Sequence, residues 1–319
     1  MNANEPRCYR IASIGEAMIE LSAREDSDDT LSLGVAGDTL NTAIYLKRLL
    51  DNRQVENEVS FVSGIGSDSF SEKIHAFCTS ESLDTSALPQ TTGQLPGIYA
   101  ISTDQHGERS FSYWRENSAA RHFFNDAFLA TLPELQRYDV IYYSGITLAI
   151  MSETTRKRWL DWLKNYMDST SDGPKQVVFD SNYRPALWSS QQHAREWIEQ
   201  SYRQCTTALV SVDDEMNLFL DKNEDAVITR LQSYQINDAV LKRGDKGPLS
   251  ITTNTSITDT APCIVVDSTA AGDSFNGAYL ASLICGDTTE EALATAHTVA
   301  KKVIGHKGAI ISPQDWQAR

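Results

Sequence analysis

Short apolar runs alternate with longer amphipathic stretches along most of the chain. From about residue 129 onward, each apolar run is followed by a stretch whose apolar positions recur at helical spacing. The expected strands are Val140–Tyr143, Val177–Asp180, Ala208–Val212, Ala239–Lys242 and Ser250–Thr252, and the expected helices are Thr154–Met167, Gln191–Tyr202, Glu224–Tyr234, Asp273–Cys285 and Thr289–Ile304. This alternation predicts an α/β fold of three layers, in which helices cover both faces of a mostly parallel sheet. Ligands of such sheets bind beyond the carboxyl ends of the strands.

The first third of the chain departs from this rhythm. Tyr9–Leu21 is expected to be a strand and Thr39–Leu50 a helix, whereas Gly97–Thr103 and Arg109–Trp114 are β-prone and aromatic. A polar turn at residues 104–108 separates the latter two segments, which predicts a hairpin. We expect a small β-sheet lid, with strands from about residues 15–36 and 95–115, on a single domain of residues 1–319.

Composition narrows the partners and the compartment. The 319 residues carry 28 Lys and Arg against 43 Asp and Glu, a formal net charge of -15, which disfavours binding to nucleic acid or to an anionic membrane. The five cysteines are scattered and form no CxxC pair, as expected of reduced thiols in the cytoplasm. We expect no signal peptide, because the polar residues 1–10 contain no basic segment followed by an apolar core. We expect no membrane span, because there is no stretch of about 18 predominantly apolar residues.

The segment Asp267–Ala278 carries the strongest chemical signal. An expected strand at Ile264–Val266 leads into small residues and then into an apolar helix from Ser274. The first amides of a helix lack internal partners and lie at the positive end of its dipole, so such a turn binds phosphate oxygens. Asp273 lies at this turn, where a carboxylate could take a proton from an attacking hydroxyl. The alternative is that Asp273 only caps a buried helix.

This segment resembles the D-T-x-G-A-G-D signature of the ribokinase-like (PfkB) carbohydrate kinases. Residues 34–41, GVAGDTLN, are similar to the second signature of that family, a glycine-containing turn that ends in Asn at a helix start. The resemblance implies the ribokinase-like fold, with a lid near residue 100. Ala270 stands where most relatives have glycine, so we expect its φ to be negative.

The resemblance also implies a set of roles. Asp273 would be the catalytic base, and the amides of Ala270, Ala271 and Gly272 would form an anion hole for a phosphoryl group from ATP. The implied nucleotide-binding residues are Asn182, Arg184, Lys242, Gly244, Lys246, Gly247 and Gly272. Asp214 or Glu215 would organise the water shell of Mg²⁺, in place of the family's N-x-x-E motif. A solvated hairpin turn is the alternative for residues 242–247.

Two arginines are candidates for binding the molecule that accepts the phosphoryl group. Tyr113 and Arg115 are two residues apart on an expected lid strand and therefore share a face, while Arg184 follows an expected strand end. The two guanidinium groups could converge on a carboxylate. Alternatively, Arg115 pairs with Glu116 or Glu108, and Arg184 binds ATP. These motifs resemble those of the 2-keto-3-deoxygluconate kinases within the family, which implies transfer to the 6-hydroxyl of that sugar acid, with Gly37, Asp38 and Asn41 at the acceptor.

Two other functions remain open. One is a fructokinase-like or ribokinase-like enzyme for a neutral sugar, and the other is a non-catalytic sugar-sensing protein of the same fold. A dinucleotide-dependent oxidoreductase is disfavoured, because no GxGxxG follows the first strand. An exposed lid sheet would also present free edges and an apolar face, so we expect a homo-oligomer formed through the lid.

Overall fold

A computed structural model describes residues 7–24, 27–103, 109–169, 175–258 and 263–317 of the chain. Its centre is an eight-stranded sheet with the order β14-β13-β12-β11-β10-β9-β1-β4. The strands in that order are Thr255–Ser256, Leu249–Ser250, Asp238–Lys242, Thr207–Ser211, Gln176–Asp180, Val140–Ser144, Tyr9–Ile14 and Asn57–Val62. All neighbours from β12 to β4 are parallel, and β13 pairs antiparallel with both β12 and β14. The expected α/β class is thereby confirmed.

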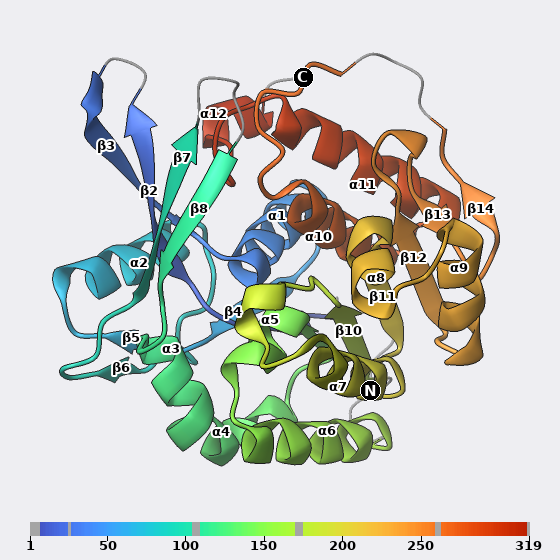
Figure 1. Cartoon of the computed structure of the whole chain (residues 1–319), viewed down its shortest axis with the longest axis horizontal. Coiled ribbons are helices and arrows are strands. Elements are labelled where there is room, and N and C mark those ends of the chain that lie inside the picture. Colours follow the sequence, from blue (N-terminus) through green and yellow to red (C-terminus); the bar gives the residue numbers. More distant parts are fainter. Residues whose placement is uncertain (1–6, 25–26, 104–108, 170–174, 259–262, 318–319) are drawn as a thin grey trace.

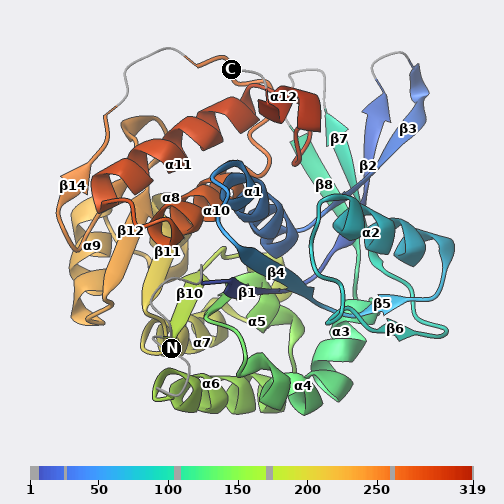
Figure 2. The ribbon, with the colours of Figure 1, turned by 180° about the vertical axis from the view of Figure 1, so that it is seen from behind.

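Helices cover both faces of this sheet (Figures 1 and 2). On one face lie α1 (Asp38–Asn52), α2 (Ser69–Ser80), α10 (Ala271–Ile284) and α11 (Thr289–Ile304), and on the other lie α4 (Phe128–Leu135), α6 (Glu153–Met167), α7 (Gln191–Tyr202), α8 (Val212–Phe219) and α9 (Glu224–Ser233). The shorter helices are α3 (Ala119–His122), η1 (Phe123–Ala127), α5 (Gly145–Ile150), η2 (Pro185–Leu187), η3 (Gly244–Lys246) and α12 (Pro313–Gln317). Among the described helices, none is long and apolar enough to cross a membrane.

Alternation along the central strands divides the apolar residues between two cores. In β9, Val140 and Tyr142 pack into the core beside α1 and α10, whereas Ile141 and Tyr143 pack into the core beside α6 and α7. Successive side chains of a strand point to opposite faces, so a strand without polar positions must be covered on both sides. This is the physical reason for the three layers.

Gly277 allows two helices of one layer to approach closely. A β-carbon on Gly277 would lie 2.5 Å from the carbonyl oxygen of Thr42 and 2.8 Å from the amide nitrogen of Leu46, both in α1. These separations are shorter than any ordinary carbon contact, so only glycine fits between the helices. The close approach places the start of α10 beside Asn41 of α1.

The expected first strand is divided between two sheets. β1 ends at Ile14, and the chain then enters β2 (Met18–Arg24) of a separate four-stranded sheet with the order β3-β2-β7-β8. Gly15 permits the transfer, because a β-carbon there would lie only 2.1 Å from Thr39 Oγ1. The sequence pattern of Tyr9–Leu21 could not predict this break, because the residues on both sides of it form largely buried strands.

The small sheet stands off the main sheet in both views (Figures 1 and 2). Its remaining strands are β3 (Ser27–Ala36), β7 (Gly97–Thr103) and β8 (Arg109–Trp114), while β5 (Ile65–Gly66) and β6 (Gln90–Thr91) pair elsewhere. The predicted antiparallel pairing of residues 97–103 with 109–114 is confirmed. The predicted turn at residues 104–108 lies outside the described residues.

Two local expectations are wrong. Ile264–Val266 is not a strand: it lies on the surface, and the three side chains are 82, 61 and 52% exposed. The expected strand Ser250–Thr252 ends at Ser250, since the chain turns from Ile251 onward. Both segments are short and rich in β-branched residues, so propensity favours a strand, but no described strand pairs with residues 264–266.

Candidate active site

A cleft of 1760 Å³ lies between the small sheet and the carboxyl ends of the central strands. Glu16 lies just after β1, Asp180 ends β10, and Lys242 ends β12, and all three line the cleft. Met18 and Tyr99 of the small sheet line its other side. The sheet geometry therefore gathers at one place the polar residues that end separate strands, as expected for a parallel sheet.

The turn before α10 has a conformation that differs from the expected one. Ala270 has a φ of 59° in the left-handed region, so the expected negative φ is wrong. This conformation costs a non-glycine residue about 1–2 kcal/mol. Ala270 is the residue immediately before α10, and its side chain makes no capping hydrogen bond. Asp273 lies inside the first turn of α10 and is not its N-cap. The alternative that Asp273 only caps this helix is therefore excluded.

The turn before α10 places backbone N–H groups beside the cleft. Ala270, Ala271 and Gly272 all line the cleft. The Ala271 amide donates to the carbonyl oxygen of Ser268 at 3.2 Å, so it would have to share its hydrogen with a ligand. Among the described residues, the amides of Ala270 and Gly272 have no such backbone acceptor. They are the more available donors of the predicted anion hole.

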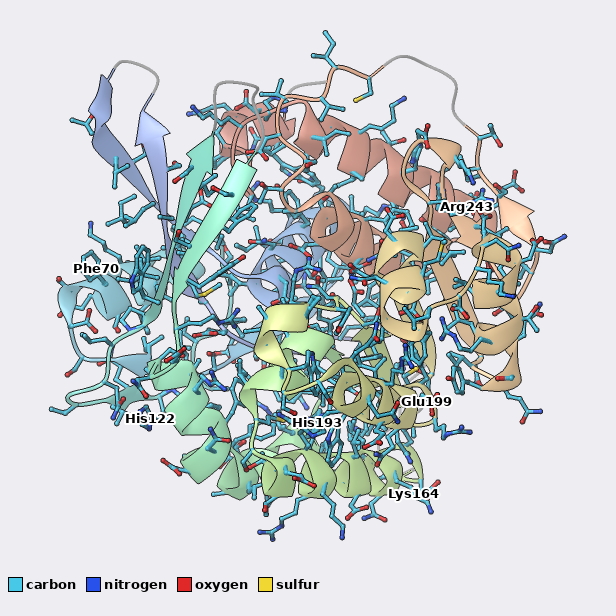
Figure 3. All side chains as sticks on the ribbon, viewed as in Figure 1. Phe70, His122, Lys164, His193, Glu199 and Arg243 are labelled. Carbon is cyan, nitrogen blue, oxygen red and sulfur yellow. The ribbon has the colours of Figure 1, made fainter. Side chains whose placement is uncertain are left out.

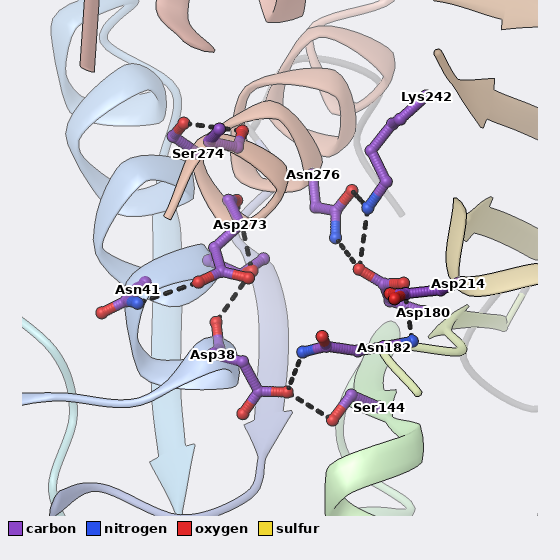
Figure 4. Close-up of polar contacts among 12 residues, drawn as sticks. Asp38, Asn41, Ser144, Asp180, Asn182, Asp214, Lys242, Asp273, Ser274 and Asn276 are labelled. Carbon is purple, nitrogen blue, oxygen red and sulfur yellow. Dashed lines mark hydrogen bonds and ion pairs between the residues drawn. The ribbon is translucent and has the colours of Figure 1, made fainter. Parts of the chain in front are cut away.

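Asp273 is held by the helix that packs against its own. Asn41 Nδ2 donates to Asp273 Oδ2 at 2.9 Å, so residues from both ends of the chain meet (Figure 4). Burial, followed by the negative charge of Asp38, raises the pKa of Asp273 to about 7, although the bond from Asn41 opposes this rise. A carboxylate with a pKa near neutrality is suited to accept a proton at physiological pH.

Asp38 is anchored from the other side of the cleft floor. Ser144 Oγ and Asn182 Nδ2 donate to Asp38 Oδ2 at 2.6 and 2.8 Å. Gly37 precedes it, and a β-carbon there would lie 2.1 Å from the carbonyl oxygen of Glu16. The structure therefore brings together Gly37, Asp38, Asn41 and Asn182, and it adds Ser144, which carried no signal because it continues an apolar strand.

A second buried network lies beside the first. Asp180 Oδ2 accepts from Lys242 Nζ at 2.8 Å and from Asn276 Nδ2 at 2.6 Å (Figure 4). Asn276 also donates to the hydroxyl of Tyr142 and accepts from Lys242. Sequence reasoning missed Asn276 and Tyr142. Asn276 could have been found, since it lies three residues after Asp273 and hence near it on α10, whereas Tyr142 is hidden in an apolar run.

The lid arginine is paired, although with neither of the acidic residues proposed as its alternative partners. Arg115 Nη2 forms an ion pair with Glu16, and both side chains are buried. Glu16 Oε1 and Arg115 Nε have no hydrogen-bond partner among the described residues. Tyr113 lies half-exposed on the same face of the lid as Tyr99, and the two ring centroids are 5.9 Å apart. Arg115 and Tyr113 both line the cleft.

Arg184 lies apart from this pair and is bound to another carboxylate. Its guanidinium is half-exposed and lies 3.4 Å from Asp214. Burial raises the pKa of Asp214, and the positive charge of Arg184 opposes that rise. Asp214 lines the cleft, but Glu215 does not, because it is fully buried against Arg230 and Tyr202. Of the two candidates for the water shell of a metal, only Asp214 faces the cleft.

Residues 242–247 reach the cleft only in part. Lys242, Arg243 and Gly244 line it, whereas Lys246 is 67% exposed and pairs with Glu224 at 3.1 Å. Gly247 has a φ of 73° and packs under the carbonyl oxygen of Ile257. Gly247 and Lys246 are therefore placed to shape this turn rather than to face the cleft.

Comparison with known proteins shows the family of this chain. A family profile described as "pfkB family carbohydrate kinase" matches residues 9–316. The chain belongs to the pfkB family of carbohydrate kinases. It is 37% identical over 309 residues to the 2-dehydro-3-deoxygluconokinase of Escherichia coli K12, covering 95% of this chain and 97% of that protein. It is also 37% identical to the enzyme of the same name from Dickeya dadantii, over 94% of this chain and 96% of that protein.

A solved carbohydrate kinase shares the fold of this pfkB family member. The fructokinase of Vibrio cholerae O395, in its fructose-, ADP- and calcium-bound form, superposes with a TM-score of 0.79 at 22% identity. The alignment covers 94% of each chain. The expected ribokinase-like architecture, a mostly parallel sheet with a smaller accompanying sheet, is confirmed.

The raised pKa of Asp273 predicts an acid limit of activity in this pfkB kinase. If Asp273 acts as a base, only its ionised form works, so kcat/KM should fall about tenfold per pH unit below pH 7. This fall, the acid limb of the pH profile of kcat/KM, is measured from initial rates between pH 5 and 9 at saturating nucleotide. Circular dichroism at pH 5 serves as the control for folding. A limb centred near pH 4 would contradict the desolvated environment described for Asp273.

Proposed function

We propose that this chain is a 2-dehydro-3-deoxygluconokinase that transfers the γ-phosphoryl group of ATP to the 6-hydroxyl of 2-keto-3-deoxygluconate. The reaction class rests on one observation, the desolvated Asp273 at the open amino-terminal turn of α10. The acceptor rests on the near full-length likeness to enzymes of that name. A single domain of residues 1–319, with its lid from about residues 15–36 and 95–115, is part of the proposal.

The site residues have separable roles in this reaction. Asp273 takes the proton of the acceptor hydroxyl as the oxygen forms a bond to the γ-phosphorus, and the bond from that phosphorus to the β–γ bridging oxygen breaks. ADP leaves with the bridging oxygen, and Asp273 later passes its proton to solvent. The amides of Ala270 and Gly272 stabilise the equatorial oxygens of the phosphoryl group during its transfer. Asn41 orients the carboxylate through its hydrogen bond.

The donor set fits a divalent cation that arrives with the nucleotide. No group of three or more His, Cys, Asp or Glu side chains able to hold a metal occurs in the described part of the chain. Mg²⁺ commonly keeps several waters and binds through substrate phosphates with one or two carboxylates. When bound, Mg²⁺ neutralises charge on the polyphosphate. Asp214 is the carboxylate that we propose for its water shell, because it faces the cleft.

The acceptor carboxylate would meet Arg115 at the lid. Glu16 occupies one terminal nitrogen of that guanidinium, and Arg115 Nε lacks a partner among the described residues. A guanidinium has five N–H donors, so Arg115 can hold Glu16 and a ligand together. Gly37, Asp38 and Asn41 would hold acceptor hydroxyls. Arg184, paired only at 3.4 Å and half-exposed, remains able to reach either the acceptor carboxylate or the nucleotide.

The same ion pair favours one competing function, kinase activity on a neutral sugar. Because Glu16 already balances the charge of buried Arg115, the lid end of the cleft could accept an uncharged ligand without leaving a buried cation unpaired. This reading groups the chain with fructokinase-like enzymes, and it makes a distinct prediction for Arg115.

An acceptor panel with an Arg115→Ala variant tests the proposed function. We expect ADP release with 2-keto-3-deoxygluconate to exceed that with fructose, ribose or adenosine by at least about 100-fold, the worth of one desolvated charged pair. In Arg115→Ala, kcat/KM for the sugar acid should fall about 100-fold, while the slow turnover of fructose should change little. An equal fall on both acceptors, or a preference for fructose in the wild type, would contradict the assignment.

The outer face of the lid supports a homo-oligomer. Leu31, Leu33 and Trp114 lie on the face opposite the cleft and are 55, 41 and 61% exposed. Exposed apolar clusters on a sheet favour association. We propose that a second copy of this lid covers them. All five cysteines are free thiols, which agrees with the cytoplasm as the proposed location.

A charge placed on this outer face should separate the subunits. The wild type should sediment as a dimer of about 71 kDa, twice the 35.4 kDa chain, and Leu33→Glu should sediment as a monomer. Phe70→Glu, at an exposed position of α2, provides the matched control and should remain dimeric. A monomeric wild type at micromolar concentration would contradict lid-mediated association.

A further inference from the structure

The ammonium group of Lys242 lies beside the turn that forms the predicted anion hole. A β-carbon placed on Gly272 would lie 3.4 Å from Lys242 Nζ, so the ammonium group adjoins the turn that precedes Asp273. Resting on the function proposed above, we propose that Lys242 is a catalytic residue that contacts the transferring phosphoryl group, and that Asn276 is the residue that positions it.

The hydrogen bonding of Lys242 leaves one donor for a ligand. An ammonium group has three N–H donors. Two of them go to Asp180 Oδ2 at 2.8 Å and to Asn276 Oδ1 at 3.0 Å, as Figure 4 shows. The side chain is 13% exposed and lines the cleft, so the remaining donor can meet a phosphoryl oxygen without any existing bond being broken.

The neighbouring cations of the same segment lack this freedom. Arg243 donates to Glu224, Ser256 and the carbonyl oxygens of Gly247 and Lys246, and Figure 3 shows it near β13 and β14. Lys246 pairs with Glu224 on the surface. Within residues 242–247, Lys242 is thus the cation that is both desolvated and directed to the anion hole.

Asn276 ties the lysine to the catalytic base. It is fully buried on α10, one turn after Asp273, and its amide bridges Lys242, Asp180 and Tyr142. The base and the anchor of the lysine are therefore carried by one helix. Lys242 also lowers the pKa of Asp273, against the larger effects of burial and Asp38. Lys242 would then have two effects: it would attract the phosphoryl oxygens, and it would favour the ionised form of Asp273.

The test compares Lys242→Met, Lys242→Arg and a matched control, Lys164→Met, whose lysine is exposed on α6 and lies at the far edge of the molecule in Figure 3. Each is measured on the best acceptor of the wild type, so the outcome does not depend on the sugar. We expect Lys242→Met to lower kcat about 10²–10³-fold, as for loss of one preorganised donor. Lys242→Arg should recover at least about tenfold, and Lys164→Met should match the wild type.

Two further readouts separate this role from nucleotide binding and from a structural effect. The Kd of MgADP, which lacks the γ-phosphate, should change less than about threefold in Lys242→Met. The acid limb of kcat/KM should move to higher pH, because the cation that lowers the pKa of Asp273 is gone. Asn276→Leu should move the limb in the same direction, with a smaller fall in kcat and unchanged MgADP affinity.

Unchanged kcat in Lys242→Met would overturn the proposal, and so would a loss of MgADP affinity that parallels the loss of kcat. If Lys242→Met unfolds because Asp180 is left without its cation, the double variant Lys242→Met/Asp180→Asn removes the imbalance and carries the same readouts. If the wild type turns over a neutral sugar only, the proposed acceptor is wrong, while the Lys242 comparison still stands on that sugar.

Discussion

Four carboxylates line the cleft close together and are partly shielded from water. They belong to Asp38, Asp180, Asp214 and Asp273. Burial raises the pKa of Asp273 and of Asp214, and the charges of Asp38 and Asp180 add to the rise at Asp273. Carboxylates crowd in this way only where donors hold them. The donors that do so here are Asn41, Ser144, Asn182, Arg184, Lys242 and Asn276. These donors come from several separate elements, so the site exists only when the fold is complete.

This arrangement explains how an acidic chain can have anionic ligands. The formal net charge of -15 opposes the approach of a nucleotide at long range. In the proposed reaction, capture would therefore depend on short-range groups, namely backbone amides before α10, the ammonium group of Lys242 and a divalent cation that arrives with the nucleotide. The ion pair of Arg115 with Glu16 balances the charge at the lid end of the cleft, where the acceptor is proposed to bind.

Sequence reasoning predicted site residues that end strands or begin helices, among them Lys242 and Asp273, and both line one cleft. The reason is that a parallel sheet brings its carboxyl ends together whatever the lengths of the connections. Sequence reasoning could not assign the partner of Arg115, since Glu16 is 99 positions away and the pairing depends on how the lid meets the main sheet. It missed Tyr142, which continues an apolar run. It gave Ala270 the wrong φ, because the expectation rested on the intrinsic preference of alanine alone, whereas Ala270 adopts the left-handed conformation in this turn.

Burial and the neighbouring carboxylates raise the pKa of Asp273 to about 7, and the proposed role of Asp273 as a base depends on that rise. The variant Asp273→Asn keeps the shape and can still accept the hydrogen bond from Asn41, but it cannot take a proton. Steady-state kinetics at pH 8, combined with thermal unfolding, provides the most direct measurement. We expect kcat to fall about 10²–10⁴-fold, with KM for both substrates nearly unchanged. The melting temperature should be at or above that of the wild type, because one crowded charge is removed. Wild-type kcat in this variant, or a marked loss of thermal stability, would contradict the proposed role of Asp273.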